Sequence, residues 1–444
     1  MTTASLAPRE QAGSGLPIPE RTGLLRGLMA HVGPGTRTGL LTLLDQGVIS
    51  AMSFATTVIV ARATSREGLG IYYLALTLTY LARGVQTQII FAPYTIYCHR
   101  RTGRASATYA GSVLIHQGAM LAIAAAGLAV AAGVLSTGVG PAGLAAVMAV
   151  LIAALPLLLL REFNRNFSLA HLDAANAIAA DVLLCVLQLG GLGLLWYFHV
   201  MSIPAVFGVM AGACAVSCTG WFFVQKHPWR FNVDRVVADW RQNWHFGRWA
   251  LASNLVGSTA PHVMPWILAA VHGEASVGLL GACGTLVGLV NVFVMGVSNY
   301  LSPKTARAFA NEGKAGLIRV VHKATLVYLA VVGGFCLLTL AAGDRLVTLV
   351  YGSRFAGGGH VLAVLAVSVL AISMGIVAGC GLWAMDRPRL TFITDVAGMA
   401  VTIAVGVACI PAWGAIGAAA ATTAGLAASA AMKWILLLRT LRAE

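Results

Sequence analysis

Two charged residues lie deep inside the first long apolar segments of the chain, Arg83 in the run 70–97 and Asp45 in the run 38–61. If both runs are helices, Arg83 lies about 20 Å and Asp45 about 24 Å from the end that the two helices share, since each residue adds about 1.5 Å. A charge at that depth of a bilayer is costly unless it is paired or faces a polar cavity. The two side chains therefore either pair and lock the helices together, or line a cavity in which Arg83 binds an anionic group and Asp45 releases that group or carries an ion.

Uncharged polar residues accompany these charges. Gln46 adjoins the aspartate, and Gln86 follows the arginine by three residues, so that it shares the same helix face. His262 lies in the middle of a later apolar run, between two prolines. We expect His262 either to mark a bend that moves and to carry a proton, or to be a structural histidine whose ring is satisfied inside the protein.

The composition indicates what kind of structure holds these residues. Of the 444 residues, 58% are hydrophobic and only 10% are charged, whereas soluble domains carry roughly 45–50% apolar and about 25% charged residues. The apolar runs are long enough to cross a bilayer and do not alternate polar with apolar residues, so they predict helices rather than a barrel. We therefore expect an all-α polytopic membrane protein of about twelve transmembrane helices.

The apolar runs form two sets of six. The first set is expected near residues 38–61, 70–97, 109–135, 141–160, 176–199 and 203–224, and the second near 248–271, 276–302, 320–342, 359–384, 391–411 and 414–437. These sets predict an N-lobe over 38–224 and a C-lobe over 248–438, joined by an interfacial cytoplasmic linker at 225–247. Residues 1–37 are expected to form a flexible cytoplasmic arm and residues 439–444 a cytoplasmic tail.

Basic residues are concentrated on one side of these helices. All but five of the 29 lysines and arginines fall on the side that carries both termini. The exceptions are Arg83, inside the membrane, and Arg62, Arg66, Arg345 and Arg354 on the opposite side. Because cytoplasmic loops carry the basic excess, both termini are expected to be cytoplasmic, in the bacterial inner membrane. The net charge of +14 then reflects contact with anionic lipid headgroups, and no nucleic-acid partner is expected.

The second half of the chain repeats the first. An offset of 208 residues sets Ala61–Gly70 over Ala269–Gly278, and an offset of 214 sets Asp181 over Asp395. Six helices separate the copies, so the repeat is parallel and relates two lobes by an axis along the membrane normal. Each of the two aspartates is expected to cap the N-terminus of a helix near the cytoplasmic face, where a carboxylate is stabilised.

The repeat also relates the candidate site residues. Asn291 takes the place of Arg83, and Asn254 takes the place of Gln46. The second lobe therefore offers neutral hydrogen bonds where the first offers charge. No metal or cofactor is expected, because the eight cysteines form no CxxC pair and the sequence has no ATP-binding motif.

Several short motifs carry a resemblance to a known family. They are Leu44–Gly47, Ala61–Arg62, Glu67–Gly70, Arg161–Phe163 with Arg165 after the fourth predicted helix, Ser302–Ala306, Val350–Gly352 with Phe355, and Ile410–Ala419. With these motifs, the chain after residue 38 resembles the polysaccharide transporter (O-antigen and exopolysaccharide flippase) branch of the multidrug/oligosaccharidyl-lipid/polysaccharide exporter superfamily. The resemblance implies a V-shaped pair of six-helix lobes around a central cavity that opens alternately to each side.

The resemblance implies a function as well. This is the transfer of a polyprenyl-pyrophosphate-linked oligosaccharide across the inner membrane, for lipopolysaccharide or exopolysaccharide biosynthesis. In such a cavity Arg83 would bind the pyrophosphate or a sugar carboxylate, and Asp45 would release it or carry a coupling ion. The implied partners are the lipid-linked oligosaccharide, membrane lipids, and polysaccharide polymerases or glycosyltransferases.

Other functions stay open at this point. A drug/cation antiporter of the same superfamily would use the carboxylate of Asp45 as its ion site, although a central arginine suits anionic cargo better. A peptidoglycan-precursor flippase typically has fourteen helices rather than twelve. A membrane-embedded glycosyltransferase or polymerase generally needs catalytic acids or large outer loops, and the outer loops of this chain are short. We therefore expect a transporter and not an enzyme.

Overall fold

The computed structural model describes residues 34–137, 143–171 and 173–443. All of the secondary structure within these ranges is helical, as the composition predicts. Most of the expected N-terminal arm, residues 1–37, lies outside the described residues.

The first half of the chain forms a bundle that we call the N-lobe. Its helices are α2 (Pro34–Ala63), α3 (Arg66–Gln86), α4 (Ala92–Tyr97), α5 (Gly103–Ser136), α6 (Leu144–Ala170), α7 (Ala174–Tyr197) and α8 (Ile203–Val224). A π-helical turn at Thr87–Phe91 connects α3 to α4, so that these two helices and the turn form a single membrane span.

The second half forms a matching bundle, the C-lobe, from four long helical stretches. They are α9 (Val233–Tyr328), α10 (Gly334–Tyr351), α11 (Gly359–Ala384) and α12 (Pro388–Ala443). The backbone of α9 leaves the helical conformation at Gly273 and Gly313, and that of α12 leaves it at Gly414. With these breaks, the described residues contain the twelve expected spans.

Glycine is required at these breaks because the backbone there is left-handed. Gly273 has a φ of 74° and Gly414 a φ of 54°, values that cost an ordinary L-residue energy and glycine very little. Each glycine turns the chain directly from one span into the next. Both reversals fall at boundaries that the apolar runs predict, between 271 and 276 and between 411 and 414.

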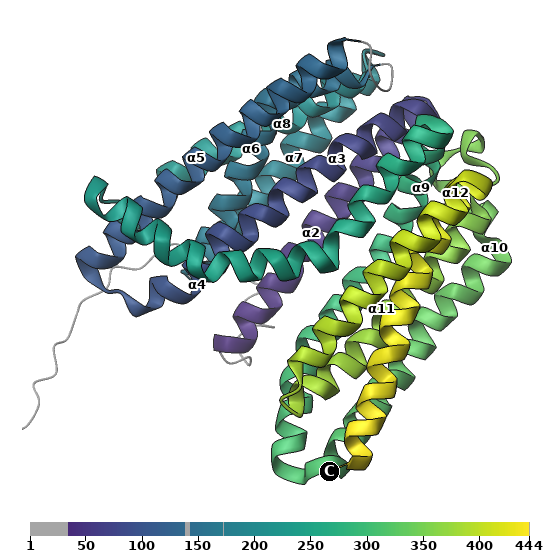
Figure 1. The fold of residues 1–444 in the computed structure, drawn as a ribbon. Coiled ribbons are helices and arrows are strands. Elements are labelled where there is room, and N and C mark those ends of the chain that lie inside the picture. The colour runs from purple at the N-terminus through teal and green to yellow at the C-terminus, as the bar shows by residue number, and fades with distance from the viewer. Residues whose placement is uncertain (1–33, 138–142, 172, 444) are drawn as a thin grey trace, which may run out of the picture.

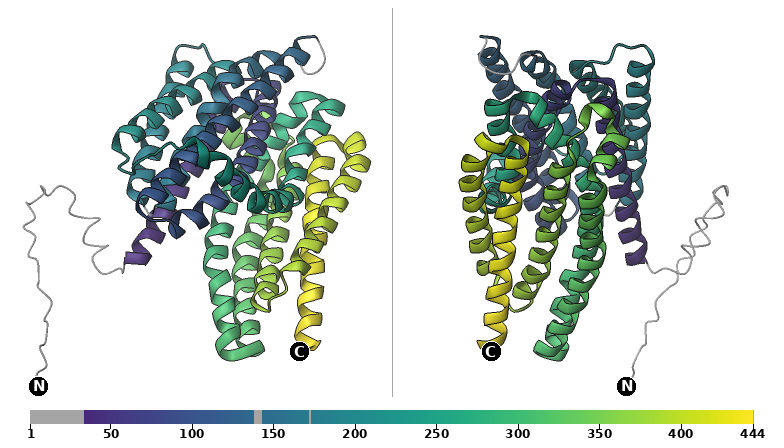
Figure 2. Two further views of the ribbon diagram at one scale, coloured as in Figure 1. Left: turned by 60° about the vertical axis from the view of Figure 1, so that its left-hand side comes forward. Right: turned by 90° about the vertical axis from the view of Figure 1, so that its right-hand side faces the viewer.

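The two lobes form a V (Figure 1). Their helices approach each other at one end and spread apart at the other, where the start of α9 and the C-terminus lie (Figures 1 and 2). We call the spread end the linker side and the opposite end, which carries the turns at Gly273 and Gly414, the far side. The V and the two six-helix lobes agree with the expected architecture.

The repeat is visible in the helix boundaries. In the N-lobe α6 ends at Ala170 and α7 begins at Ala174, while in the C-lobe α11 ends at Ala384 and α12 begins at Pro388. Both pairs of boundaries are related by the offset of 214 residues found in the sequence. Residues at this offset therefore occupy equivalent places in the two lobes.

Two expectations about charged residues near the helix ends were wrong. Asp181 lies well inside α7, whose N-terminus is capped instead by Asp173, which accepts a hydrogen bond from the backbone of Asn176 at 3.3 Å. Asp395 likewise lies inside α12, which begins at Pro388. Neither carboxylate is a cap, because both helices begin earlier than their apolar runs.

The segment Arg161–Arg165 was also misplaced by the sequence. It was expected to follow the fourth span, but α6 continues through it to Ala170, and Arg161 and Glu162 are buried. A run of charges normally indicates the end of a membrane helix. Here the charges stay within the helix because partners on neighbouring helices neutralise them.

The predicted linker is a short extended segment followed by the first turns of α9. This part of α9 packs on the N-lobe, where Arg101 forms an ion pair with Asp239 at 2.9 Å and Tyr109 donates to Asn243 at 2.8 Å. In Figure 1 it crosses the linker side of the N-lobe before α9 turns into the C-lobe. The segment between the halves is thus partly helical, and its helix is fixed to the N-lobe.

Candidate substrate cavity

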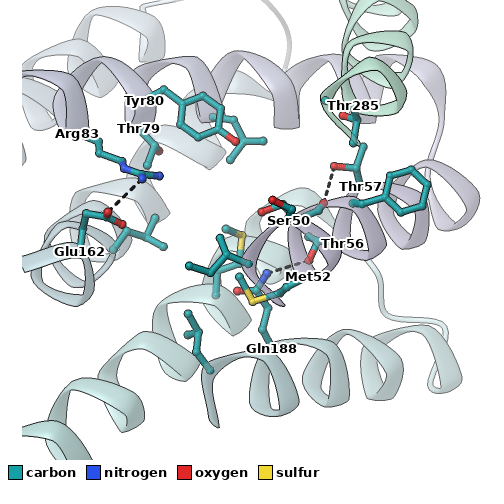
Figure 3. Close-up of a pocket in the computed structure, with 18 of the residues that line it drawn as sticks. Ser50, Met52, Thr56, Thr57, Thr79, Tyr80, Arg83, Glu162, Gln188 and Thr285 are labelled. Carbon is teal, nitrogen blue, oxygen red and sulfur yellow. Dashed lines mark hydrogen bonds and ion pairs between the residues drawn. The ribbon is translucent and has the colours of Figure 1, made fainter. Parts of the chain in front are cut away.

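A cavity of about 420 Å³ lies between the lobes and mostly within the N-lobe. Its walls come from α2, α3, α6, α7 and α8, and the segment Gly284–Leu289 of α9 supplies the C-lobe side. Figure 3 shows the polar side chains that line it. They are mainly Gln46, Ser50, Ser53, Thr56, Thr57, Thr79, Tyr80, Arg83, Gln188 and Thr285. The cavity is thus lined by many neutral hydrogen-bonding groups and few charges.

Arg83 is the most accessible charged group of this lining. Its side chain is 44% exposed, and one guanidinium nitrogen contacts Glu162 Oε1 at 3.1 Å. Glu162 is only 6% exposed, comes from α6 and also borders the cavity, below the arginine in Figure 3. A guanidinium carries five N–H donors in a planar fork. The ion pair to Glu162 therefore fixes Arg83 while part of its donor set still faces the cavity.

Behind Arg83 lies a buried network of charges. Arg161 contacts Glu162 at 3.1 Å and also pairs with Asp181. Arg165 contacts Asp181 at 3.1 Å and Asp45 at 2.5 Å. We call these five residues together with Arg83 the charge cluster. Its three guanidinium groups balance its three carboxylates, which is the condition under which charges remain tolerable in a low-dielectric interior.

The cluster corrects the pairing considered for Asp45. This aspartate contacts Arg165 rather than Arg83, is 1% exposed, and does not belong to the cavity lining. Asp45 and Arg83 lie at a similar depth in the membrane, but this does not make them partners. Helix α6 supplies a separate partner to each, Arg165 to Asp45 and Glu162 to Arg83. Arg161, Glu162 and Arg165 were not among the predicted site residues. Two features of the sequence could have indicated these residues. The three charges are spaced along one helix, and single aspartates lie in the apolar runs that form α2 and α7.

The other predicted site residues divide between the cavity and the packed interior. Gln46 lines the cavity. Gln86 is fully buried instead, and its amide donates to Gln117 at 3.0 Å and to the carbonyl of Leu159 at 2.7 Å. Gln86 therefore ties α3 to α5 and α6.

The predicted residues of α9 lie outside the cavity lining. Asn254 lies close to Gly84 on α3, since a Cβ atom at Gly84 would come within 3.2 Å of its side-chain oxygen. Asn291 is half-buried further along α9. His262 lies against Tyr80, with 5.8 Å between the ring centroids. The backbone around His262 is helical, and the break in this part of α9 comes at Gly273.

The cavity is closed on the far side by arginines that bind across the lobes. Arg62 of α2 donates to the carbonyls of Leu349 and Val350 at 2.6 and 2.7 Å, and Arg66 donates to that of Ala356 at 2.7 Å. In return, Arg354 of the C-lobe donates to the carbonyl of Thr64 at 3.1 Å. We call these contacts the far-side clasp.

Close backbone packing completes this closure. A Cβ atom at Gly70 of α3 would collide with the carbonyl of Glu274, and one at Gly278 of α9 would collide with the carbonyl of Arg66. Glycine at both positions lets α3 and α9 touch backbone to backbone. The lobes are therefore in direct contact on the far side, whereas their helices spread apart on the linker side (Figure 1).

A second cavity of about 350 Å³ lies inside the C-lobe, between α9, α11 and α12. Its wall includes Gly375 and Gly379, and its charges are a single pair in which Lys433 contacts Asp395 at 2.7 Å. Ser429 donates to the same aspartate oxygen at 2.9 Å. We call this cavity the C-lobe pocket.

Comparison of this fold with solved structures gives matches that span nearly the whole chain. The inward-closed structure of the lipid II flippase MurJ aligns with a TM-score of 0.73 at 13% identity, covering 92% of this chain and 87% of that chain. An inward-facing multidrug resistance MATE family transporter of the MOP superfamily aligns with a TM-score of 0.70 at 14% identity, covering 88% of this chain and 94% of that chain. The chain has the fold of MOP-superfamily transporters. MOP is the multidrug/oligosaccharidyl-lipid/polysaccharide superfamily that the sequence motifs resemble.

A structure in another conformation also aligns with this chain. An outward-facing MATE transporter aligns with a TM-score of 0.61 at 15% identity, covering 92% of this chain and 95% of that chain. By TM-score, the inward-facing structure is the better match of the two.

The sequence itself matches no protein-family model and no curated protein. The protein is therefore a multi-pass membrane protein with a MOP fold, and its neighbours in structure are transporters rather than enzymes.

Proposed function

We propose that this protein is a flippase that moves a polyprenyl-pyrophosphate-linked oligosaccharide from the cytoplasmic to the outer leaflet of the bacterial inner membrane. In this proposal the linker side is cytoplasmic, because it carries nearly all basic residues. The cavity receives the head of the lipid from that side while the far-side clasp is closed. The arginine–carbonyl bonds of the clasp must then break for release on the other side.

The observation that carries the proposal is the half-exposed guanidinium of Arg83. It lies at membrane depth on the wall of a cavity, and its ion pair with the buried Glu162 holds it toward that cavity. An arginine fork suits the geometry of phosphate and carboxylate groups, which it can bind through two parallel hydrogen bonds. Pyrophosphate and acidic sugars both provide such groups.

The rest of the lining suits a sugar chain. Gln46, Ser50 and Thr79 offer hydrogen bonds to hydroxyl groups, and the ring of Tyr80 offers an apolar face. Because the lobes spread apart on the linker side (Figure 1), the apolar polyprenyl tail would remain in the bilayer. The proposal therefore assigns separate surroundings to the polar and apolar parts of the cargo.

The arrangement of carboxylates favours this function over an antiporter for cationic drugs. Within the described part of the N-lobe spans, Asp45, Glu162 and Asp181 each contact an arginine. A drug cation that approached these groups would have to displace a guanidinium. The ion site that the antiporter hypothesis requires at Asp45 is thus occupied by Arg165.

The proposal is tested in the cell that carries the gene. Deletion is expected to make the lipid-linked oligosaccharide accumulate and to abolish the surface glycan, and the wild-type gene should restore both. Arg83→Gln should fail to restore them, whereas Arg319→Gln, which changes an exposed arginine outside the cavity, should succeed. Unchanged glycan together with greater sensitivity to cationic drugs would instead support the antiporter.

A further inference from the structure

We call the first turns of α9, residues 233–247, the linker helix. A basic pocket of about 350 Å³ lies on the outside of the N-lobe, where the linker helix crosses α5. It is lined by Arg101, Arg104, Ala105 and Thr108 of α5 and its approach, and by Asn232, Arg235 and Asp239 of α9 and its cap. Three arginines and one aspartate leave two positive charges in excess. We call it the linker pocket. It does not share any lining residue with the substrate cavity.

The three arginines differ in how they are held. Arg101 is committed to the structure, since it contacts Asp239 at 2.9 Å, donates to Gln242 at 2.7 Å and lies 4.0 Å from the centre of the Tyr109 ring. Arg104 and Arg235 are exposed, and among the described residues neither forms an ion pair. The aspartate is thus neutralised by one arginine, and the other two keep their donors available.

Backbone groups add to the positive potential of the pocket. The N-terminus of α5 begins at Gly103, and its cap residue Thr102 makes no side-chain hydrogen bond to it. The N-terminus of α9 begins at Val233 on the opposite wall, where the side chain of Asn232 accepts a hydrogen bond from the backbone N–H of Asp234 at 3.0 Å, so the uncapped N-terminus is that of α5. Free amides at a helix N-terminus attract anions. Together with the arginines, they make the pocket suitable for a phosphate group that carries one or two negative charges.

The linker helix also shows at what level of the membrane this pocket lies. Val233, Val237, Trp240 and Trp244 are spaced along one face of the helix, and their exposed fractions are 79, 57, 37 and 41%. A stripe of exposed valine and tryptophan on a helix that also carries arginines is typical of a helix lying in the membrane interface. Lipid phosphates occupy this same level, so they meet the pocket at high local concentration.

We propose that the linker pocket binds the phosphate of an anionic membrane phospholipid. The phosphate would lie between Arg104 and Arg235, while the acyl chains continue past the exposed apolar face of the linker helix. Since Arg104 belongs to α5 and Arg235 to α9, the bound lipid joins the linker to the N-lobe. It therefore stabilises the linker position on which the geometry between the lobes depends.

The test is lipid retention by the purified full-length protein, measured by native mass spectrometry in detergent. The probes are phosphatidylglycerol, phosphatidylcholine and inorganic pyrophosphate. We expect phosphatidylglycerol to bind in preference to phosphatidylcholine, and the double variant Arg104→Gln/Arg235→Gln to lower its affinity about thirtyfold, since each interfacial arginine contributes about 1 kcal/mol. Arg319→Gln, an exposed arginine elsewhere, should leave the affinity unchanged.

Each alternative outcome overturns the proposal. Equal retention of both lipids would mean that the headgroup charge is not recognised, and equal binding by the double variant would mean that the pocket is not the site. Displacement of the lipid by pyrophosphate at comparable concentration would assign the site to a free phosphate compound. Both substituted arginines are exposed, so in lipid-free detergent the unfolding temperature of the double variant should match that of the wild type. The assay needs no transport, so its result is independent of the proposed flippase function.

Discussion

The N-lobe and the C-lobe use equivalent positions in opposite ways. At the offset of 214 residues, Asp181 corresponds to Asp395, but Arg161 and Arg165 correspond to Gly375 and Gly379. In the N-lobe the arginines fill the space between the helices and neutralise the aspartate. In the C-lobe the glycines leave a cavity of about 350 Å³ around the aspartate.

This difference shows that the same helix arrangement can form a rigid charged support in one lobe and an open pocket in the other. The charge cluster makes the N-lobe a rigid support behind Arg83, because each of its charges is held by a partner on another helix or turn. The C-lobe pocket contains only the pair of Asp395 with Lys433, in which the aspartate is 42% exposed. We therefore expect substitutions in the N-lobe to affect stability far more than equivalent substitutions in the C-lobe.

The largest difference is expected between the two aspartates themselves. Asp181→Asn removes the carboxylate that Arg161 and Arg165 share and leaves the three guanidinium groups of the cluster with only two buried carboxylates. Breaking a buried ion pair on one side costs about 3–5 kcal/mol. Asp395→Asn breaks a pair that is partly exposed, and such pairs contribute about 0–1 kcal/mol. The unfolding temperature of the purified protein in detergent should fall much further for the first variant. Equal losses would mean that the two lobes hold their aspartates equally tightly.

A smaller and opposite effect is expected at a glycine of the C-lobe pocket. A Cβ atom at Gly379 would meet no atom closer than 3.9 Å, the methyl group of Thr391. Gly379→Ala should therefore raise the stability by about 1 kcal/mol, because alanine favours a helix interior by that amount. Thermal unfolding measures the gain. A lower unfolding temperature would show that the wall of the pocket requires glycine, in contrast to our account of it as open space.

The smallest effect concerns the linker-side end of each fourth helix. His171 ends α6, where burial lowers its pKa below the ordinary value of 6.5. It faces the ring of His227 at 3.8 Å between centroids, with Tyr94 and Asp173 nearby. The equivalent residue in the C-lobe is Met385.

The direction of the pH dependence follows from this lowered pKa. The folded state favours the neutral imidazole of His171. The stability that this neutral ring contributes is therefore fully present above the pKa of 6.5 that the histidine has in the unfolded chain. It is lost as the pH falls through the lower pKa of the folded protein. Unfolding temperatures at about pH 7.5 and about pH 5.5 should therefore differ more for the wild type than for His171→Asn. The same difference in both proteins would place the pH sensitivity elsewhere.

Much of the fold could be predicted from the sequence, because hydrophobic length and basic asymmetry are local properties. The twelve spans and the linker before the seventh follow from runs of apolar residues and from the charges between them. The breaks at Gly273 and Gly414 also fall at predicted boundaries between apolar runs, although a tight reversal between two apolar helices leaves almost no polar segment.

The candidate site was predictable only in part. Arg83 was identified because a charge in the middle of an apolar run is rare, and it does line the cavity. The partners of Arg83 and Asp45 could not be identified, because they depend on how α2, α6 and α7 pack rather than on depth alone. Glu162 and Arg165 lie near the end of their apolar run and resembled a loop in the sequence. A helix that carries charges past its apolar run is recognised only when opposite charges on neighbouring helices are considered together.

The most direct test of the account is a flipping assay with the purified protein in proteoliposomes. A fluorescent polyprenyl-pyrophosphate oligosaccharide is incorporated, and its appearance in the outer leaflet is measured by access to an impermeant quencher. Loss of charge-assisted hydrogen bonds from Arg83→Gln should slow flipping tenfold or more, by about 1.5–3 kcal/mol. The unfolding temperature should change little, since Arg83 is 44% exposed and Glu162 keeps its contact with Arg161. Flipping by the variant at the wild-type rate would contradict the assignment of Arg83, and absence of flipping by the wild type would contradict the proposed function.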